Sequence, residues 1–201
     1  MNHHFSRFVL AAAFFGLSLA SAPALSQDTS WYAGFNVGQA KVKDFDCTGT
    51  TSCDDKDTAW SIFGGYQFNK NFGVELGYVD LGEARGSGTD PILGAFSASF
   101  EATGFELSGV GTLPISEKFS VYGKLGLFMW DLDVKASSST LGSGSLSEDG
   151  TDLTFGVGVR WGFTKNLTAQ LQWQRYNDIG DDATTGKSDI DVIGAGIIFR
   201  F

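Results

Sequence analysis

The most constraining feature of this sequence is its final segment, residues 193–201, in which large apolar residues alternate with small or polar ones. The large apolar residues are Ile193, Ile197, Phe199 and Phe201, and the small or polar ones are Gly194, Gly196 and Arg200. Period-two alternation predicts a β-strand with two different faces. An apolar strand at a sheet edge is exposed to further pairing, but this edge disappears if the strand closes a barrel against the first strand. The segment therefore predicts a β-barrel, provided that similar strands precede it.

Earlier segments show the same alternation, and the connections between them are alternately long and short. The expected strands are residues 31–42, 58–68, 72–81, a strand ending at 113, a strand starting at 119, 151–163 and 167–177. The expected long loops are residues 44–57, 82–94, 136–150 and 178–187, and the short turns are 69–71, 114–118 and 164–166. Strands of about ten residues match the ~9–11 that cross a bilayer at a tilt. The sequence thus predicts an all-β fold, an eight-stranded antiparallel up-and-down transmembrane β-barrel.

In two of the expected strands, some polar residues fall at the odd-numbered positions that otherwise carry the large apolar residues. Ser99 and Glu101 are odd-numbered, as is Phe105, and Asp131 follows Met129 in the same way. A β-bulge in each strand would explain this pattern, and so would strands that continue beyond the membrane. We favour the second explanation because both polar stretches lie toward the long-loop end.

The first residues predict a secretory signal peptide. Arg7 supplies a positive charge, and the apolar run from Phe8 to Ala20 is followed by small residues, with Ala24 and Ser26 at the positions expected before a cleavage site. We therefore divide the chain into a signal peptide, residues 1–26, and an outer-membrane β-barrel domain, residues 27–201. No later apolar run approaches the ~20 residues that a membrane helix needs.

The bulky face of the barrel could point inward, as in a soluble lipocalin-like barrel, or outward toward lipid. Aromatic residues gather near the short turns and predict an interfacial girdle, which consists of Trp31, Phe68, Phe72, Phe119, Trp161, Phe163, Phe199 and Phe201. The opposite face carries mid-strand charges, which would cost several kcal/mol each against hydrocarbon. These charges, Glu75, Glu106, Lys124 and Arg160, are therefore expected to form a network in the lumen. Both observations favour the membrane barrel.

Composition excludes several functional classes. The formal net charge is −9, which argues against nucleic-acid binding. Both histidines, His3 and His4, lie in the predicted signal peptide. The mature chain therefore has no histidine for acid–base catalysis, for a Ser-His-Asp triad or for metal ligation. We predict that it is not an enzyme and that it uses no cofactor or bound metal.

The loops carry two weaker signals. Cys47 and Cys53 lie in one polar loop of an exported protein and predict a local disulfide. Aspartates are frequent in the same loop and in the last one, where they form a solvated acidic rim or a divalent-cation site. The first loop lacks the EF-hand spacing, so the signal for a cation site is weak.

The chain resembles the transmembrane domain of the OmpA family of outer-membrane barrels. The motifs that carry the resemblance are Trp31-Tyr32-x-Gly34, Gly64-Gly65-Tyr66-Gln67, Gly73-x-Glu75-x-Gly77-Tyr78, Leu81-Gly82, Leu113-Pro114-Ile115, Tyr122-x-Lys124-x-Gly126, Trp173-Gln174, Ile179-Gly180-Asp181 and Arg200-Phe201. The resemblance implies a Gram-negative outer-membrane location and contact with lipid and lipopolysaccharide. It also implies assembly by the barrel-assembly machinery, with Phe199 and Phe201 as the assembly signal. We expect a monomer without the peptidoglycan-binding domain that often follows such barrels. Glu75 and Lys124 stand where the family has an acid and a base, whereas Arg160 stands where an acid is expected and Gln170 where a base is expected, so the family's interior charge pattern is only partly kept.

Three functional classes compete. The first is a structural or surface-interaction protein that presents four long loops to an extracellular ligand, on a barrel whose lumen is filled by side chains. The second is a small porin-like channel for ions or small solutes, gated by the interior charges. The third is a lipid A deacylase, which would need a Ser–His pair that the mature chain lacks. We predict the first class, because eight strands leave room only for side chains.

Overall fold

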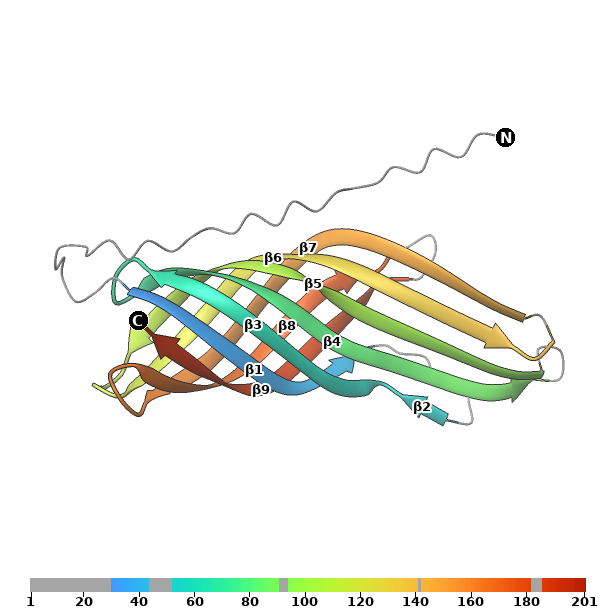
Figure 1. Cartoon of the computed structure of the whole chain (residues 1–201), viewed down its shortest axis with the longest axis horizontal. Coiled ribbons are helices and arrows are strands. Elements are labelled where there is room, and N and C mark those ends of the chain that lie inside the picture. The colour runs from blue at the N-terminus through green and yellow to red at the C-terminus, as the bar shows by residue number, and fades with distance from the viewer. Residues whose placement is uncertain (1–29, 44–51, 91–93, 141, 182–185) are drawn as a thin grey trace, which may run out of the picture.

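A computed structural model of the chain describes residues 30–43, 52–90, 94–140, 142–181 and 186–201. These residues form a barrel of long, tilted β-strands (Figure 1). The strands are β1 (Ser30–Val42), β2 (Ser52–Asp54), β3 (Lys56–Gln67), β4 (Phe72–Asp90), β5 (Gly94–Pro114), β6 (Phe119–Ser138), β7 (Gly142–Gly162), β8 (Leu167–Ile179) and β9 (Ser188–Arg200). The described part of the chain holds no helix long and apolar enough to cross a membrane. The predicted signal peptide and Cys47 lie outside the described residues, so the signal peptide and the disulfide with Cys53 remain predictions.

Eight of these strands close the barrel, and each pairs antiparallel with two neighbours. The pairing runs consecutively from β3 to β9, and β1 joins the ring by pairing with both β3 and β9. In the closing pair, Tyr32 lies opposite Arg200 and Val42 lies opposite Ile190. The ninth strand, β2, is a short addition that pairs with β4 beyond the ring. The predicted eight-stranded antiparallel barrel is therefore confirmed.

Neighbouring residues along a strand face opposite sides of the barrel wall. Glu75 is 3% exposed and points into the lumen, whereas the next residue, Leu76, is 55% exposed on the outer face. Leu125 and Ile197 belong to the same outer surface, with 64% and 57% of their surface exposed. Such a continuous apolar belt is stable against lipid rather than against water. The lipocalin-like alternative is therefore wrong, because the bulky face lies outside.

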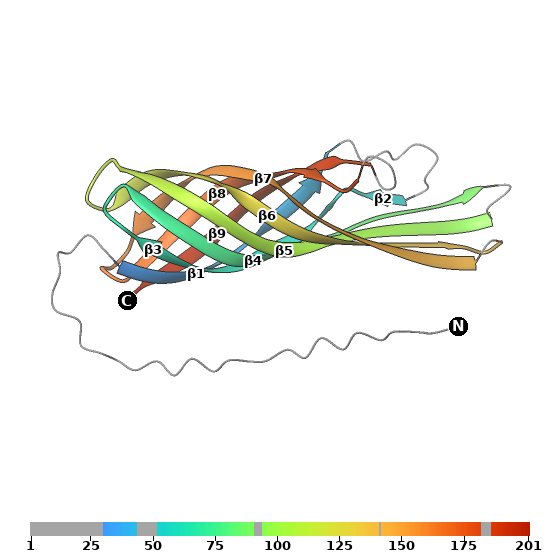
Figure 2. The same cartoon turned by 90° about the horizontal axis from the view of Figure 1, so that it is seen from above.

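Four strands continue beyond the belt as one antiparallel sheet, made of the distal parts of β4, β5, β6 and β7 (Figure 2). We call this sheet the extension. Our prediction of long loops at residues 82–94 and 136–150 is wrong, since β4 runs to Asp90 and β6 runs to Ser138. The serine- and glycine-rich composition suggested loops, but ladder hydrogen bonds are made by the backbone and form with small polar side chains as well.

The strand register explains why polar residues occupy some of the odd-numbered, outward-facing positions of β5 and β6. Their pairing is continuous from the Phe96–Ser138 pair to the Pro114–Ser120 pair, so neither strand is bulged against the other. Ser99 therefore shares the outer face with Phe105, but it lies in the extension. The strands continue past the belt, which is the explanation that we favoured.

A bulge does occur in β4, where the sequence analysis did not place one. Leu81 and Gly82 stand together opposite Ala102, because the register with β5 shifts between Asp80 and Glu83. Gly82 has a positive φ of 77°, a conformation that side chains with a Cβ disfavour. Beyond this point the inward parity of β4 changes, so that Leu81 before the bulge and Ala84 after it are both buried.

Candidate functional site

Four charged side chains meet in the lumen, and each comes from a different strand. They are Glu75 on β4, Glu106 on β5, Lys124 on β6 and Arg160 on β7. Lys124 Nζ lies 3.0 Å from Glu75 Oε2 and 2.9 Å from Glu106 Oε1. Arg160 Nη2 lies 2.8 Å from Glu75 Oε1. The structure thus brings together all four residues that the sequence placed in the lumen, and we call them the charged layer.

Uncharged side chains complete the hydrogen bonding of the two carboxylates. The Tyr32 hydroxyl donates to Glu75 Oε1 at 2.9 Å. Gln174 Nε2 donates to Glu106 Oε2 at 2.8 Å, and the Tyr176 hydroxyl donates to the same oxygen at 3.1 Å. Buried charges are tolerated when they are both paired and hydrogen-bonded. Each carboxylate of the layer meets that condition.

Arg160 makes further contacts in the lumen besides its ion pair with Glu75. Its Nε donates to Gln170 Oε1 at 3.1 Å, and Gln170 Nε2 donates in turn to Asn36 Oδ1 at 2.6 Å. Its Cζ lies 4.1 Å from the centre of the Tyr122 ring, within reach of a cation–π contact. Gln170, which replaces the base expected from the family resemblance, therefore accepts a hydrogen bond from the arginine that replaces the expected acid.

The charged layer fills the lumen at its level. The space among Phe63, Glu75, Glu106 and Lys124 measures only about 10 Å³, which is near the smallest volume that holds one water molecule. Glycine makes room for the large inward rings, since a Cβ at Gly65 would collide with the ring of Tyr32. The arrangement therefore closes the barrel with side chains.

Apolar side chains occupy the lumen on the side of the charged layer that lies away from the short turns. This apolar layer comprises Ala40, Ala59, Val79, Leu81, Ala102, Phe128, Trp130, Leu132, Tyr176, Ile179, Ile190 and Val192. The Phe128 ring lies 4.7 Å from the Tyr176 ring, and Phe128 has no exposed surface. This layer was not predicted from the sequence, although the residue pattern of β6 indicates it. Phe128, Trp130 and Leu132 continue the inward parity of Lys124.

The lumen opens beyond the apolar layer into a cavity at the mouth opposite the short turns. This cavity measures about 570 Å³, and its lining includes Val42, Phe96, Phe100, Leu132 and Ile190. This cavity is therefore lined by apolar residues together with charged ones, among them Asp55, Asp57 and Lys187.

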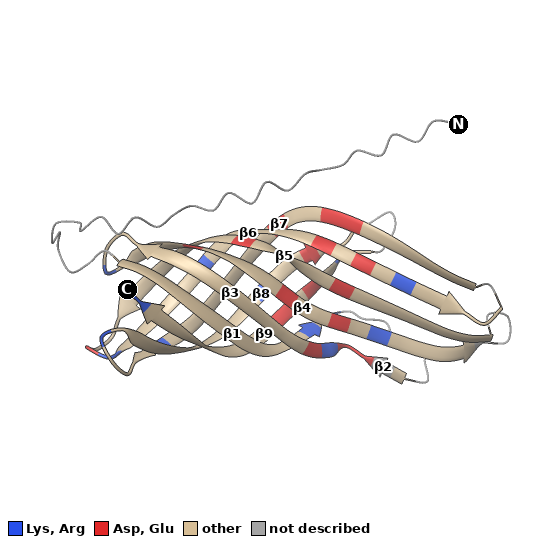
Figure 3. Ribbon diagram, in the orientation of Figure 1, with Lys and Arg blue, Asp and Glu red and all other residues tan. Residues whose placement is uncertain are grey.

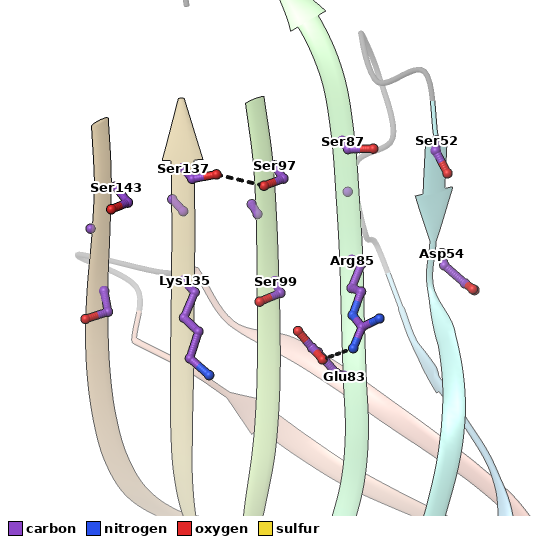
Figure 4. A pocket seen from close by; sticks show the side chains of 15 residues that line it. Ser52, Asp54, Glu83, Arg85, Ser87, Ser97, Ser99, Lys135, Ser137 and Ser143 are labelled. Carbon is purple, nitrogen blue, oxygen red and sulfur yellow. Dashed lines mark hydrogen bonds and ion pairs between the residues drawn. The ribbon is translucent and has the colours of Figure 1, made fainter. Parts of the chain in front are cut away.

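The outer face of the extension forms a second, open hollow of about 850 Å³ (Figure 4). Serine side chains from neighbouring strands line it, and Ser97 Oγ lies 3.0 Å from Ser137 Oγ. Glu83 accepts a hydrogen bond from Arg85 in the same hollow, and this bond lowers the pKa of Glu83. Among the described residues, no group of three His, Cys, Asp or Glu side chains is arranged to hold a metal ion.

The residues predicted for the aromatic girdle all lie exposed near the short turns. Trp161 and Phe163 contact each other at 4.9 Å between ring centres, and Phe199 and Phe201 do so at 5.3 Å. The backbone N–H of Phe201 donates to the carbonyl of Trp31 at 3.0 Å, which fixes the last residue to the first strand. These contacts place the aromatic residues in the barrel wall, while the role of Phe199 and Phe201 in assembly stays a prediction.

Comparison with known proteins gives a consistent result. The profile of the family described as OmpA-like transmembrane domain matches residues 26–201. Outer membrane protein A of Shigella dysenteriae is 31% identical over 185 residues, which cover 90% of this chain and 51% of that protein. Outer membrane protein A of Yersinia pseudotuberculosis is 30% identical over 200 residues, which cover 96% of this chain and 54% of that protein. The chain spans about half the length of the curated relatives that it matches.

Solved structures show the same fold at lower sequence identity. Neisserial surface protein A is similar with a TM-score of 0.61 and 16% identity, covering 86% of this chain and 99% of that one. Ail, the attachment invasion locus protein of Yersinia pestis, is similar with a TM-score of 0.53 and 19% identity, covering 87% of this chain and 98% of that one.

Proposed function

The chain belongs to the family of OmpA-like transmembrane domains and lies in the cell outer membrane, and from this premise we propose that it serves as a surface-interaction barrel with a closed lumen. Its relatives are outer-membrane barrels. The surface role is the step that we add.

The observation that carries the proposal is the extension. β5, β6 and β7 have 21, 20 and 21 residues, about twice the length that the ~9–11-residue crossing of a bilayer requires. The additional residues are paired from Ala84–Phe100 to Asp90–Gly94 in one hairpin and from Val134–Leu146 to Ser138–Gly142 in the other. A paired sheet holds its side chains in fixed positions, which lowers the entropy lost when a partner binds.

The chemistry of the hollow favours a partner that hydrogen-bonds. Its lining offers hydroxyl groups together with two cations, Arg85 and Lys135, and two carboxylates, Asp54 and Glu83. A solved structure shows Ail in complex with the heparin analogue sucrose octasulfate. A highly sulfated ligand needs an excess of positive charge, whereas here cations and acids balance. We therefore propose a neutral or weakly charged partner, such as a carbohydrate or a protein surface.

The channel alternative is weakened by the lumen. A pore needs a continuous water path, and the charged layer and the apolar layer occupy successive levels of the barrel. Bilayer conductance separates the two functions, because only a channel gives steady openings.

Shortening both hairpins tests the surface role. Residues 84–100 and residues 134–146 would each be replaced by an Asn-Gly turn, which joins the paired ends Glu83–Glu101 and Asp133–Ser147 in register. Cells that display the wild-type or the shortened barrel would be compared for adhesion to immobilised oligosaccharides and extracellular glycoproteins. We expect the shortened barrel to fold, to shift its mobility on gels after boiling, and to lose adhesion.

A matched control keeps the extension and changes the opposite end of the barrel. Lys165→Gln alters a short turn, and we expect its adhesion to equal that of the wild type. Equal adhesion by the wild-type and shortened barrels, or no adhesion above that of cells without the barrel, would overturn the proposed surface role.

A further inference from the structure

A cavity of about 330 Å³ opens at the end of the lumen where the short turns lie. It is separated from the extracellular mouth by the charged and apolar layers. Its lining includes Gln67, Thr112, Thr168 and Arg200 from the ends of four strands, with Arg160 of the charged layer above them. This cavity plays no part in the proposed surface role.

Three buried side-chain atoms in the described part of the chain have no hydrogen-bond partner there, and all three belong to residues that line this cavity. They are Gln67 Oε1, Thr112 Oγ1 and Arg200 Nε. Gln67 is only 4% exposed, and its amide nitrogen is already used, because it donates to the carbonyl of Asn69 at 2.7 Å. Buried polar atoms are nearly always paired. Three unpaired atoms around one space indicate that a polar group from outside the chain enters it.

Hydrogen bonds to the short turns fix the backbone at two of these three residues. Arg200 donates its N–H to the carbonyl of Asn166 at 2.8 Å and accepts a bond from Asn166 Nδ2 at 2.7 Å. Thr112 is fixed in the same way by Asn71, whose carbonyl accepts the Thr112 N–H and whose side chain donates to the Thr112 carbonyl. Two turn asparagines therefore position the cavity walls before any ligand arrives.

The charge around the cavity is positive. Lys70, Lys118, Lys165 and Arg200 line it together with a single acid, Glu117. Arg200 forms no ion pair with any residue of the described ranges, unlike Arg160, which is neutralised by Glu75. The opposite end of the molecule is dominated by acidic residues (Figure 3). A ligand at the short-turn end is therefore expected to be an anion.

The unpaired atoms specify which anion fits. Arg200 Nε can only donate, and the Thr112 hydroxyl can donate to an anion oxygen. Gln67 Oε1 can only accept, so the ligand must also bring a proton of its own. Hydrogen phosphate has both oxyanion oxygens and a P–OH group at neutral pH, whereas sulfate and a phosphodiester have no such proton. We propose that this periplasmic cavity binds hydrogen phosphate, with Arg200, Thr112 and Gln67 as its ligands.

The test is a calorimetric titration of the mature barrel in phosphatidylcholine nanodiscs, in a phosphate-free buffer of low salt at neutral pH. We expect one inorganic phosphate to bind per barrel, with at least tenfold higher affinity than sulfate. Gln67→Leu removes the acceptor and should bring the phosphate-to-sulfate ratio close to one. Gln67→Glu places a carboxylate at the same point and should weaken both anions at least tenfold.

Further variants separate the site from general charge attraction. Arg200→Gln should weaken both anions at least tenfold, and Thr112→Val provides a second variant away from the last strand. Lys135→Gln removes a cation from the extension and should leave both affinities unchanged. Each variant is first checked for the gel shift of a folded barrel. Equal binding of phosphate and sulfate by the wild type, or phosphate binding that Gln67→Glu does not weaken, would overturn the proposal and show that water fills the cavity.

Nanodiscs containing phosphatidylglycerol distinguish the source of the phosphate. The negative charge of this lipid weakens the binding of both anions equally, so we expect the ratio of phosphate affinity to sulfate affinity to be retained. Loss of the preference for phosphate would mean that a lipid phosphodiester takes the site, which would overturn the assignment to hydrogen phosphate.

Discussion

The lumen is closed in two different ways along one set of strands. At the charged layer, Lys124 on β6 bridges two carboxylates, whereas Phe128, four residues further along β6, packs among apolar side chains. Tyr176 joins the two regions, because its ring packs on Phe128 while its hydroxyl donates to Glu106. The period-two pattern therefore determines which residues face inward, while the chemistry of the inward-facing residues changes along the barrel axis.

The two regions should respond differently to mutation. Removing Lys124 from the charged layer leaves Glu106 buried without a cation and leaves Glu75 with Arg160 alone, so the cost exceeds the value of the lost contact. Removing a side chain from the apolar layer costs its transfer free energy and the cavity that it leaves.

Lys124→Met should have the largest effect. It leaves Glu75 and Glu106 without their shared cation, and breaking a buried pair in this way costs about 3–5 kcal/mol. The measurement is the free energy of unfolding in urea, followed by tryptophan fluorescence in phosphatidylcholine vesicles. Lys135→Met, which removes an exposed cation from the extension, is the control and should leave this free energy nearly unchanged.

Adding Glu106→Gln to Lys124→Met sharpens the same test. The second change removes the carboxylate that Lys124→Met leaves without a cation, so the double variant should be more stable than Lys124→Met alone. If the losses in free energy of unfolding of Lys124→Met and Glu106→Gln, each measured alone, add up to the loss of the double variant, the charged layer is not a coupled network.

Phe128→Ala should come next, with a loss of about 3 kcal/mol, because this fully buried ring fills the apolar layer and neighbours relax only partly around the gap. The matched control is Phe105→Ala, which removes an aromatic ring from the outer face and leaves no internal cavity. Both are measured by urea unfolding. An equal loss in the two variants would mean that the apolar layer is not packed as a core.

Trp130→Phe should cost about 1 kcal/mol, since it removes the indole N–H that donates to Asp152 Oδ2 at 2.8 Å. Trp60→Phe on the outer face serves as the control. If the two urea midpoints coincide, the bond to Asp152 contributes nothing to stability.

Arg85→Ala should have the smallest effect on stability, because its ion pair with Glu83 is exposed in the extension. The hydrogen bond from Arg85 lowers the pKa of Glu83, so its small stabilising effect is present above the ordinary carboxyl pKa and disappears as the pH falls through the lowered value. A carboxyl NMR titration should show the pKa of Glu83 rising in the variant. An unchanged titration would contradict the contact.

Much of the fold followed from alternation alone, because inward and outward residues must differ in a membrane barrel. Glu75, Glu106, Lys124 and Arg160 could be assigned to the lumen because charges cannot face lipid. The bulge at Gly82 could not be predicted, since glycine is equally common in regular strands of this chain. The extension was mistaken for loops because serine and glycine carry no strong strand preference. The cavity formed by Gln67, Thr112 and Arg200 depends on closure between residues far apart in sequence, which alternation does not determine.

The most direct test of the account is the single-channel conductance of the wild-type barrel in a planar lipid bilayer. We predict a barrel that stays closed, because the charged layer and the apolar layer both fill the lumen. Steady, large openings of correctly folded wild-type protein would contradict it and would favour the channel function over the surface role.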